Sequence, residues 1–231
     1  MKNIGRNIKG KLIVIDGADG AGKATQAKLL VDKLVAEGYS TELIDFPQYY
    51  DNFFGKLVGE YLTGKFGKAV EVDPYLASLL YAGDRFESAP KIKKWLSEGK
   101  IVVTNRYSAS NAAFQGVKFK GQKQKNFLDW LDNLEFKIYN IPKEDYLLYL
   151  DVPIKISQKL LLKKSKRQYT KNAKKDHHEK DVEYQAKVAS LYKKLTSQKN
   201  NWIRINCVFG EKLLSPAQIH EKIWKVIEKI V

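Results

Sequence analysis

The sequence predicts an α/β fold in which a doubly wound, five-stranded parallel sheet is flanked by helices on both faces. Five short apolar runs alternate along the chain with longer segments whose apolar residues recur at helical spacing. The apolar runs are continuous, which is typical of strands buried on both faces of a parallel sheet. The first run ends in a glycine-rich stretch that opens a helical segment. With 231 residues, 44% of them hydrophobic, and neither repeat nor linker, we expect one domain over 1–231.

The first strand, loop and helix account for the amino-terminal part of this pattern. Residues 11–17 form a short β-branched run that ends in glycine. The segment that follows carries apolar residues at helical spacing, among them Leu30 and Leu34, and reaches a glycine stop at Gly38. Residues 40–47 then read as a second strand that is closed by a proline.

The remaining elements repeat the same rhythm. Further strands are expected at 100–107, 145–152 and 201–207. Helices are expected at 53–64, 74–98, 109–115, 122–139, 154–165, 179–198 and 215–230. One stretch departs from the rhythm, because residues 163–181 are very polar and rich in lysine. They read either as an ordinary solvated loop or as a mobile lid, about 163–180, that closes over phosphates.

A phosphate-binding loop is the clearest functional motif. Gly17, Gly22 and Lys23 satisfy the pattern G-x-x-x-x-G-K, between a strand and a helix as that motif requires. Glycines let backbone N–H groups surround phosphate oxygens, the helix start adds its dipole, and the lysine reaches the outer phosphates. Ala24 stands where the motif has a hydroxyl that contacts magnesium. The residues expected to bind ATP are Gly17, Ala18, Asp19, Gly20, Ala21, Gly22, Lys23, Ala24 and Thr25.

Composition narrows the classes of function. Lysine and arginine number 41 against 26 aspartates and glutamates, so the net charge is +15. Such a surplus attracts phosphorylated metabolites and is compatible with nucleic-acid binding, but the lysines are dispersed and favour solvated helix faces. The lone cysteine, Cys207, excludes an internal disulfide and a cysteine zinc site. Because no apolar run has the length of a signal peptide or a membrane span, we expect a cytoplasmic protein without membrane or nucleic-acid partners.

Several motifs, in this order and spacing, resemble thymidylate kinases over about residues 11–207. These motifs are GADGAGKATQ, DFPQYY, YAGDRFE, NRYSASNAAFQG and YLDVP. The resemblance implies a P-loop NTPase fold with a five-stranded parallel sheet. It also implies transfer of the γ-phosphoryl group from ATP to dTMP, which serves dTTP synthesis, in a magnesium-dependent homodimer.

The resemblance assigns a site for dTMP. Phe46 and Tyr81 match aromatic residues that pack near and stack on the thymine ring, and Asn111 matches a side chain that reads the base. Arg85 matches an arginine that hydrogen-bonds the base and Arg106 one that grips the monophosphate, and a guanidinium suits both because its fork makes two parallel bonds. The full expected set is Phe46, Pro47, Tyr49, Tyr81, Arg85, Arg106, Ser110, Asn111 and Phe114.

Three further positions carry expectations from the same resemblance. Phe114 would lie under the 2′ position of the sugar and exclude ribonucleotides. Tyr49 stands where some members have an arginine on the monophosphate, so its phosphate role is weaker. Asp19 matches a carboxylate near the 3′-hydroxyl and the transferring phosphate.

The lid has its own expected residues. Some members carry an arginine in the phosphate loop at the position of Gly20, and this chain resembles the other type, in which basic lid residues close on ATP. Positive charge there would stabilise the transferring phosphoryl group. The expected lid residues are Lys163, Lys164, Arg167, Asp176 and Glu179, and the expected catalytic set is Lys23, Asp19, Arg106 and Arg167.

Two positions on the magnesium side depart from the family. Ala24 lacks a hydroxyl, and Asn105 replaces the acid of the family's D-R-Y. We expect Mg²⁺ to be held largely by nucleotide phosphates and water, with Asp19 and, more weakly, Asn105 as protein ligands. The departures leave two alternatives to an active thymidylate kinase, which are a catalytically impaired nucleotide-binding relative and a kinase for another (deoxy)pyrimidine monophosphate.

Overall fold

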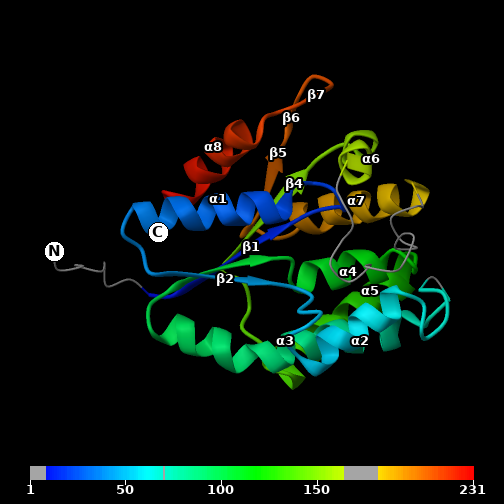
Figure 1. The fold of residues 1–231 in the computed structure, drawn as a ribbon. Helices are drawn as coiled ribbons and strands as arrows, with labels where there is room; N and C mark the ends of the chain where they lie inside the picture. Colours follow the sequence, from blue (N-terminus) through cyan, green and yellow to red (C-terminus); the bar gives the residue numbers. More distant parts are fainter. Residues whose placement is uncertain (1–8, 70, 164–181) are drawn as a thin grey trace.

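A parallel five-stranded sheet forms the centre of the molecule (Figure 1). The computed structural model describes residues 9–69, 71–163 and 182–231. The strands lie in the order β2-β3-β1-β4-β5, and all neighbouring pairs are parallel. Their bounds are β1 Lys11–Asp16, β2 Thr41–Asp45, β3 Ile101–Asn105, β4 Tyr146–Asp151 and β5 Trp202–Asn206. The predicted fold class and the five predicted strands are therefore confirmed.

Helices cover both faces of the sheet. They are α1 Lys23–Ala36, α2 Phe53–Leu62, α3 Pro74–Ser97, α4 Ser108–Gly116, α5 Gly121–Asp132, α6 Ile154–Lys163, α7 Val182–Ser197 and α8 Pro216–Ile227. Figure 1 shows α1 and α8 side by side on one face of the sheet and α3 on the opposite face. In the described residues, no helix has the combined length and apolar character that crossing a membrane requires.

The alternation of side chains along the strands divides the core into two halves. On β1, Leu12 and Val14 belong to the cluster that packs against α3, α4 and α7. Ile13 and Ile15 belong to the cluster that packs against α1 and α8. Because successive strand residues point to opposite faces, a continuous apolar strand serves both halves at once.

Local sequence signals explain where several helices begin. Asp73 accepts hydrogen bonds from the first backbone N–H groups of α3, and a proline occupies the first helical position. Asn52 caps α2 by accepting from the N–H of Gly55. Ser215 and Gln218 form a reciprocal capping box at the start of α8. Capping residues of this kind fix the starts of these helices through contacts within a few neighbouring positions.

Two details differ from the elements that the sequence predicts. The single helix expected at 122–139 is instead α5 followed by a π-helical turn, η1 Asn133–Ile138. Such a wider turn is rare and often occurs at functional sites. In addition, a short hairpin of β6 Val208–Phe209 and β7 Lys212–Leu213 follows the fifth strand. These two-residue strands are too short to produce a pattern in the sequence.

The part of the chain between α6 and α7 includes the predicted lid. Lys163 is the last residue of α6. Lys164, Arg167, Asp176 and Glu179 lie outside the described residues, and so does the predicted start of the helix at 179–181. The described part of that helix, α7, begins at residue 182.

Candidate active site

The phosphate loop lies at the carboxyl end of β1, where open α/β sheets bind their ligands. Gly22 adopts φ +85° immediately before α1, and no side chain caps the helix start there. The first N–H groups of α1 are thus available to a phosphate. The ammonium of Lys23 is buried against the loop and donates to the carbonyl oxygens of Gly17 and Ala18, at 3.0 and 2.8 Å. The loop therefore combines backbone donors with a lysine close to them.

Close backbone contact explains why Gly20 is glycine. This residue adopts φ +79°, and a Cβ there would lie 2.3 Å from the carbonyl oxygen of Ser157 on α6. Any side chain at this position would push α6 away from the loop. An arginine at this position therefore has no room in this structure.

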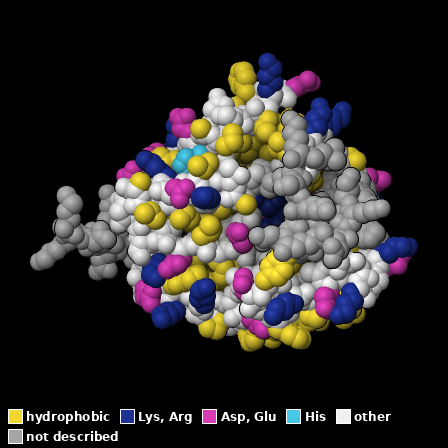
Figure 2. Space-filling view, viewed as in Figure 1, with side chains coloured by type: hydrophobic (Ala, Val, Ile, Leu, Met, Phe, Trp, Pro, Cys, Tyr) yellow, Lys and Arg dark blue, Asp and Glu magenta, His cyan; other side chains and the backbone are white. Residues whose placement is uncertain are grey.

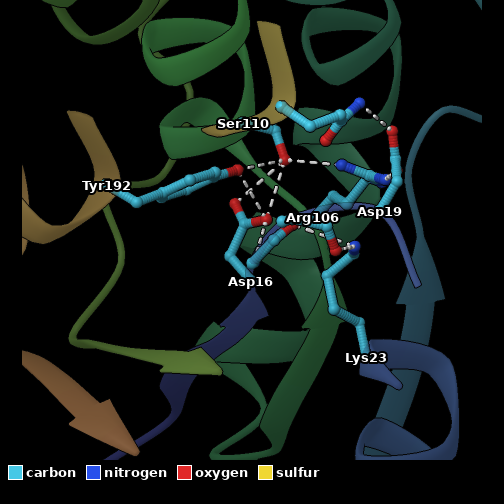
Figure 3. Close-up of polar contacts among 9 residues, drawn as sticks. Asp16, Asp19, Lys23, Arg106, Ser110 and Tyr192 are labelled. Carbon is cyan, nitrogen blue, oxygen red and sulfur yellow. Dashed lines mark hydrogen bonds and ion pairs between the residues drawn. The ribbon is translucent and has the colours of Figure 1, made fainter. Parts of the chain in front are cut away.

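A buried network joins the phosphate loop to the end of β3 (Figure 3). Asp16 is fully buried and accepts hydrogen bonds from Ser110 at 2.8 Å and from Tyr192 at 2.9 Å. Asp19 pairs with the guanidinium of Arg106 and accepts from the Nε2 of Gln185 at 3.1 Å. Two carboxylates, one at the end of β1 and one in the loop, are in this way held by Arg106, which follows β3, and by residues of α4 and α7.

Arg106 occupies a strained and electrostatically distinctive position. Its φ of 69° is unusual for a residue with a side chain, and such conformations cluster at functional sites. Burial is the largest single influence and acts to lower the pKa of Arg106, but the charge of Asp19, together with Asp16 and the neighbouring tyrosines, raises it, and the net change is upward. The guanidinium is therefore permanently charged and also lies over the ring of Phe114, 5.5 Å from its centroid. These features suit an arginine that binds an anion.

A cavity beside the loop contains all of the residues predicted to bind dTMP. Its lining is Asp19, Phe46, Pro47, Tyr49, Leu62, Tyr81, Arg85, Arg106, Tyr107, Ser110, Asn111, Phe114 and Gln115. Every residue of the predicted dTMP set is in this lining. The structure thus brings together residues that follow β2 and β3 with residues of α3 and α4, as much as 68 positions apart in the sequence, from Phe46 to Phe114.

Aromatic side chains form much of the cavity wall. Phe46 is buried and packs edge-on against Tyr107, with ring centroids 5.7 Å apart. Tyr81 packs edge-on against Tyr61 at 6.1 Å. Both rings that were predicted to lie near a base are fixed by a second aromatic ring, which favours a flat ligand in the cavity.

A buried acid that the sequence motifs did not reveal lies behind the cavity. Glu135, on η1, accepts from the Nε and Nη2 of Arg85 at 2.7 and 2.5 Å. It also accepts from the Nδ2 of Asn111 at 3.1 Å. Burial acts to lower the pKa of Arg85, whereas the charge of Glu135 raises it, and the net change is upward. Arg85, predicted to hydrogen-bond a base, lines the cavity and also belongs to a buried ion pair.

The sequence contained signals for two missed residues. Phe127, Leu131 and Leu134 form a buried stripe at helical spacing, and Glu135 continues that stripe as an acid. Gln185 is likewise a polar residue on the buried stripe of α7. A polar side chain on an otherwise apolar stripe needs a partner, so it points to a buried polar network.

The magnesium side of the loop borders a second cavity, which Lys23, Ala24, Asp45 and Asn105 line together. The Oδ1 of Asn105 is buried and has no hydrogen-bond partner in the described part of the chain. Asp45 is its register neighbour on β2 and hydrogen-bonds to it, and desolvation raises the pKa of that carboxyl. An unpaired oxygen beside a carboxylate fits Mg²⁺, which prefers oxygen ligands and few protein contacts.

A dedicated protein cage for the metal does not occur in the described residues, where no group of three or more His, Cys, Asp or Glu could hold an ion. Asp19, the other predicted ligand, pairs with Arg106 in this structure. A metal at this place would therefore depend mainly on ligands from nucleotide phosphates and water.

Comparison with known proteins places the chain in a family. The family model of thymidylate kinase matches residues 15–215. Human thymidylate kinase is 38% identical over 146 residues, which cover 63% of each chain. A probable thymidylate kinase from Thermococcus onnurineus is 35% identical over 224 residues, covering 94% of this chain and 96% of that one.

Structural similarity gives the same result. The thymidylate kinase of Candida albicans superposes with a TM-score of 0.73 at 27% identity, covering 96% of this chain and 92% of that one. That structure is described as revealing the origin of the Candida enzyme's broad substrate specificity. The family predicted from the motifs is confirmed by the family model, by curated relatives and by a solved structure. The chain belongs to the thymidylate kinase family, whose members are ATP-dependent nucleoside monophosphate kinases.

Proposed function

We propose that this chain transfers the γ-phosphoryl group of ATP to dTMP and forms ADP and dTDP, a step that leads to dTTP. The observation that carries the proposal is a single cavity that joins Asp19 and Arg106, next to the phosphate loop, to Arg85 and Asn111. A phosphate loop alone supports binding of one nucleotide. The adjoining cavity, with aromatic walls, a charged guanidinium and an amide, supports a second nucleotide whose base is flat and polar at its edge.

The contacts of the described residues support a binding site for each substrate. The phosphates of ATP bind the loop and the start of α1, and Lys23 exchanges its carbonyl acceptors for phosphate oxygens. The monophosphate of dTMP binds Arg106 and competes there with the carboxylate of Asp19. The base lies between the aromatic walls that Phe46 and Tyr81 contribute.

The transfer itself requires positioning and charge. A phosphate oxygen of dTMP attacks the γ-phosphorus of ATP, and the bond from that phosphorus to the bridging β-phosphate oxygen breaks as ADP leaves. Lys23 and Arg106 bring positive charge to the phosphates from two sides of the loop, which stabilises the charge that spreads during transfer. Neither a covalent enzyme intermediate nor a strong general base is needed.

Magnesium binding fits the same place. The Oδ1 of Asn105 and a carboxylate, Asp45 or Asp19, would hold the ion together with phosphates and water, and the ion would neutralise phosphate charge. Ala24 supplies no ligand, so a large part of the metal affinity would come from the bound nucleotide.

The proposal also includes the lid and the homodimer that the family resemblance implies. The family resemblance assigns a lid that would close over the phosphates, with Arg167 as its catalytic member; its residues are Lys163, Lys164, Arg167, Asp176 and Glu179, of which all but Lys163 lie outside the described residues. A homodimer in the cytoplasm follows from the family resemblance. Large exposed apolar side chains on α2, α3 and η1 support a dimer, and they are Phe53, Leu76, Phe86 and Ile138. Light scattering coupled to size-exclusion chromatography measures that state directly.

A coupled assay of ADP release over a panel of nucleoside monophosphates tests the reaction. We expect the highest kcat/KM with dTMP and a dependence on Mg²⁺. Lys23→Ala should lower turnover by a factor of about 10³ or more, because the developing charge loses its main partner in the loop. Lys28→Ala, an exposed lysine on the same helix, is the matched control and should change little.

The alternatives predict different outcomes. An absence of turnover on every monophosphate, together with intact ATP binding, would favour a catalytically impaired relative. Faster turnover of another pyrimidine monophosphate would reassign the substrate. Ala24→Ser restores the usual hydroxyl, so it should lower the Mg²⁺ concentration needed for half-maximal rate, and an abolished rate would contradict this placement of the metal.

A further inference from the structure

The π-helical turn η1 places one carboxylate behind two of the residues that line the base cavity. Glu135 is fully buried, and its carboxylate accepts from both Arg85 and Asn111. It does not line the cavity itself. The hydrogen bonds through which Glu135 acts on the cavity are those that it accepts from these two neighbours.

The amide of Asn111 is held in one orientation. Its Nδ2 donates to the backbone carbonyl of Ser78 at 3.2 Å and to Glu135 at 3.1 Å, so both N–H groups are engaged. Its Oδ1 is buried and has no hydrogen-bond partner within the described residues. A flipped amide would turn its oxygen towards a carboxylate and a carbonyl, which is repulsive in a buried site. Asn111 thus offers the cavity an acceptor and not a donor.

The guanidinium of Arg85 is held in the same way. Glu135 engages its Nε and Nη2 as a two-bond fork. The Nη1 group lies outside this fork, and Arg85 also lines the cavity. One carboxylate therefore orients an acceptor and a donor, on two different helices, towards one ligand.

We propose that Glu135 is a positioning residue that makes the cavity selective for 4-keto over 4-amino pyrimidines. The inference rests on the proposed function and specifies its base recognition. Thymine and uracil carry N3–H, a donor that fits the oxygen of Asn111, and a 4-keto oxygen that fits Arg85. Cytosine carries an acceptor at N3 and a donor at its 4-amino group. In a cytosine complex, acceptor would face acceptor and donor would face donor.

The energetic basis is the cost of unmatched buried polar groups. A site that hydrogen-bonds its ligand strongly rejects an analogue that leaves the site's buried polar groups unpaired. The loss of a single methylene contact gives much weaker discrimination. We expect the wild-type chain to prefer dTMP to dCMP by about 100-fold or more in kcat/KM. The carboxylate strengthens this preference, because it is the charged one of the two acceptors, beside the carbonyl of Ser78, that keep the amide of Asn111 from turning.

The decisive variant is Glu135→Gln, which preserves shape but brings its own amide donor. The introduced amide would let the side chain of Asn111 turn, so the ratio of kcat/KM for dTMP to that for dCMP should fall at least about tenfold. The KM for ATP should stay within about twofold, since Glu135 is remote from the phosphate loop contacts. The same ratio measured as Kd by calorimetry is the readout that does not depend on turnover.

Two further variants complete the experiment, one as a control and one as a substitute. Glu144→Gln is the matched control, because Glu144 is also buried and accepts from the indole N–H of Trp202 at 2.9 Å, away from the cavity. It should lose stability with an unchanged dTMP to dCMP ratio. If Glu135→Gln does not fold, Glu135→Asp keeps the negative charge but withdraws the Oε1 that Arg85 and Asn111 share, and the ratio should then fall about threefold or more.

The outcomes separate this inference from the proposed function. A folded Glu135 variant whose ratio equals that of the wild type overturns the inference while dTMP kinase activity stands. A wild-type chain that neither binds nor phosphorylates dTMP refutes the proposed function, and this inference with it. A ratio that falls in the Glu135 variants but not in Glu144→Gln supports the inference.

Discussion

At the scale of single residues, backbone conformation decides which side chains the phosphate loop can carry. Gly20 and Gly22 both adopt positive φ, at 79° and 85°, where side chains are strained. Only Gly20 also lies against another element, because its missing Cβ would meet the carbonyl of Ser157. Arg106 adopts a positive φ without being glycine, and its pairing with Asp19 helps to hold it there. Backbone strain and close packing thus concentrate around the expected phosphate-binding site.

We predict that Gly20→Ala is more destabilising than Gly22→Ala. Both variants incur backbone strain of about 1–2 kcal/mol. Gly20→Ala also pushes a methyl group to 2.3 Å from a backbone oxygen of α6, which should add about 1–3 kcal/mol. Urea unfolding without nucleotide measures both free energies. Equal losses of stability in the two variants would show that α6 does not pack closely on the loop.

Asp84 provides a prediction of pH dependence. Its carboxylate is fully buried and accepts from the backbone N–H of Gln48 and from Asn52. Burial raises its pKa from 3.8 to about 6, although the hydrogen bond from Asn52 and the charge of Arg85 act to lower it. The folded state therefore binds a proton more tightly than the unfolded state, and this contribution to stability is lost as the pH rises from about 4 to about 6.

The expected loss is on the order of 3 kcal/mol, since one pKa unit corresponds to about 1.4 kcal/mol. Asp84→Asn cannot ionise, so its free energy of unfolding should lack this decline. The measurement is chemical denaturation of both proteins over a pH series that spans about 4 to about 7. A difference between the two proteins that stays constant with pH would rule out the raised pKa.

At the scale of elements, two helical layers on opposite faces hold the sheet, and the site lies where the strands end. Residues after β1, β2 and β3 reach the same edge because the strands are parallel. The π-helical turn η1 is the exception to regular structure, and it carries Glu135 inward to the cavity residues. The irregular turn η1 thus contributes a buried carboxylate next to the site, in addition to the residues that regular helices contribute.

Cys207 can serve as a probe of local opening in the layer formed by β5 and α8. This residue is the chain's single cysteine, is fully buried, and has its pKa raised to about 12 by burial. We expect a disulfide reagent to label it very slowly in the native protein and rapidly in denaturant. Labelling in the native state would then report opening of this layer.

Ser215→Ala should accelerate that labelling about fivefold at mildly alkaline pH. The substitution removes the capping box of α8 and costs about 1 kcal/mol, which corresponds to about a fivefold increase in the open state. Ser97→Ala, at the end of α3 in the other layer, is the matched control and should leave the rate unchanged. Equal acceleration by both variants would mean that Cys207 reacts only after global unfolding.

At the scale of the whole molecule, the net charge of +15 should influence encounter with nucleotides. On the face shown in Figure 2, Lys and Arg side chains are interspersed with Asp and Glu across the described surface. The excess positive charge on this face is therefore spread out. The long-range electrostatic field comes from the whole molecule and not from one patch.

We predict that kcat/KM for both nucleotides falls about three- to tenfold between about 20 and about 200 mM NaCl. Salt screens the attraction between the positive protein and its anionic substrates, since the screening length shortens to below about 10 Å over this range. At saturating substrate, kcat should change by less than about twofold. A kcat/KM that is independent of salt would show that the net charge does not steer the substrates.

The sequence by itself determined the elements and the phosphate loop. Continuous apolar runs, glycine stops and capping residues act over a few neighbouring positions, so the five strands and the start of α1 followed from local patterns. The motifs also placed Phe46, Arg106 and Asn111 in the right order, and the structure gathers them in one cavity.

Only the tertiary structure decided which polar groups meet. The pairs Arg85–Glu135 and Asp19–Arg106 join residues 50 and 87 positions apart, and the contact of Asp45 with Asn105 depends on β2 lying beside β3. Strand order and helix packing create such contacts, and no local pattern encodes them. A buried polar group must find its partner wherever the fold brings one close, so partner choice belongs to the folded chain as a whole.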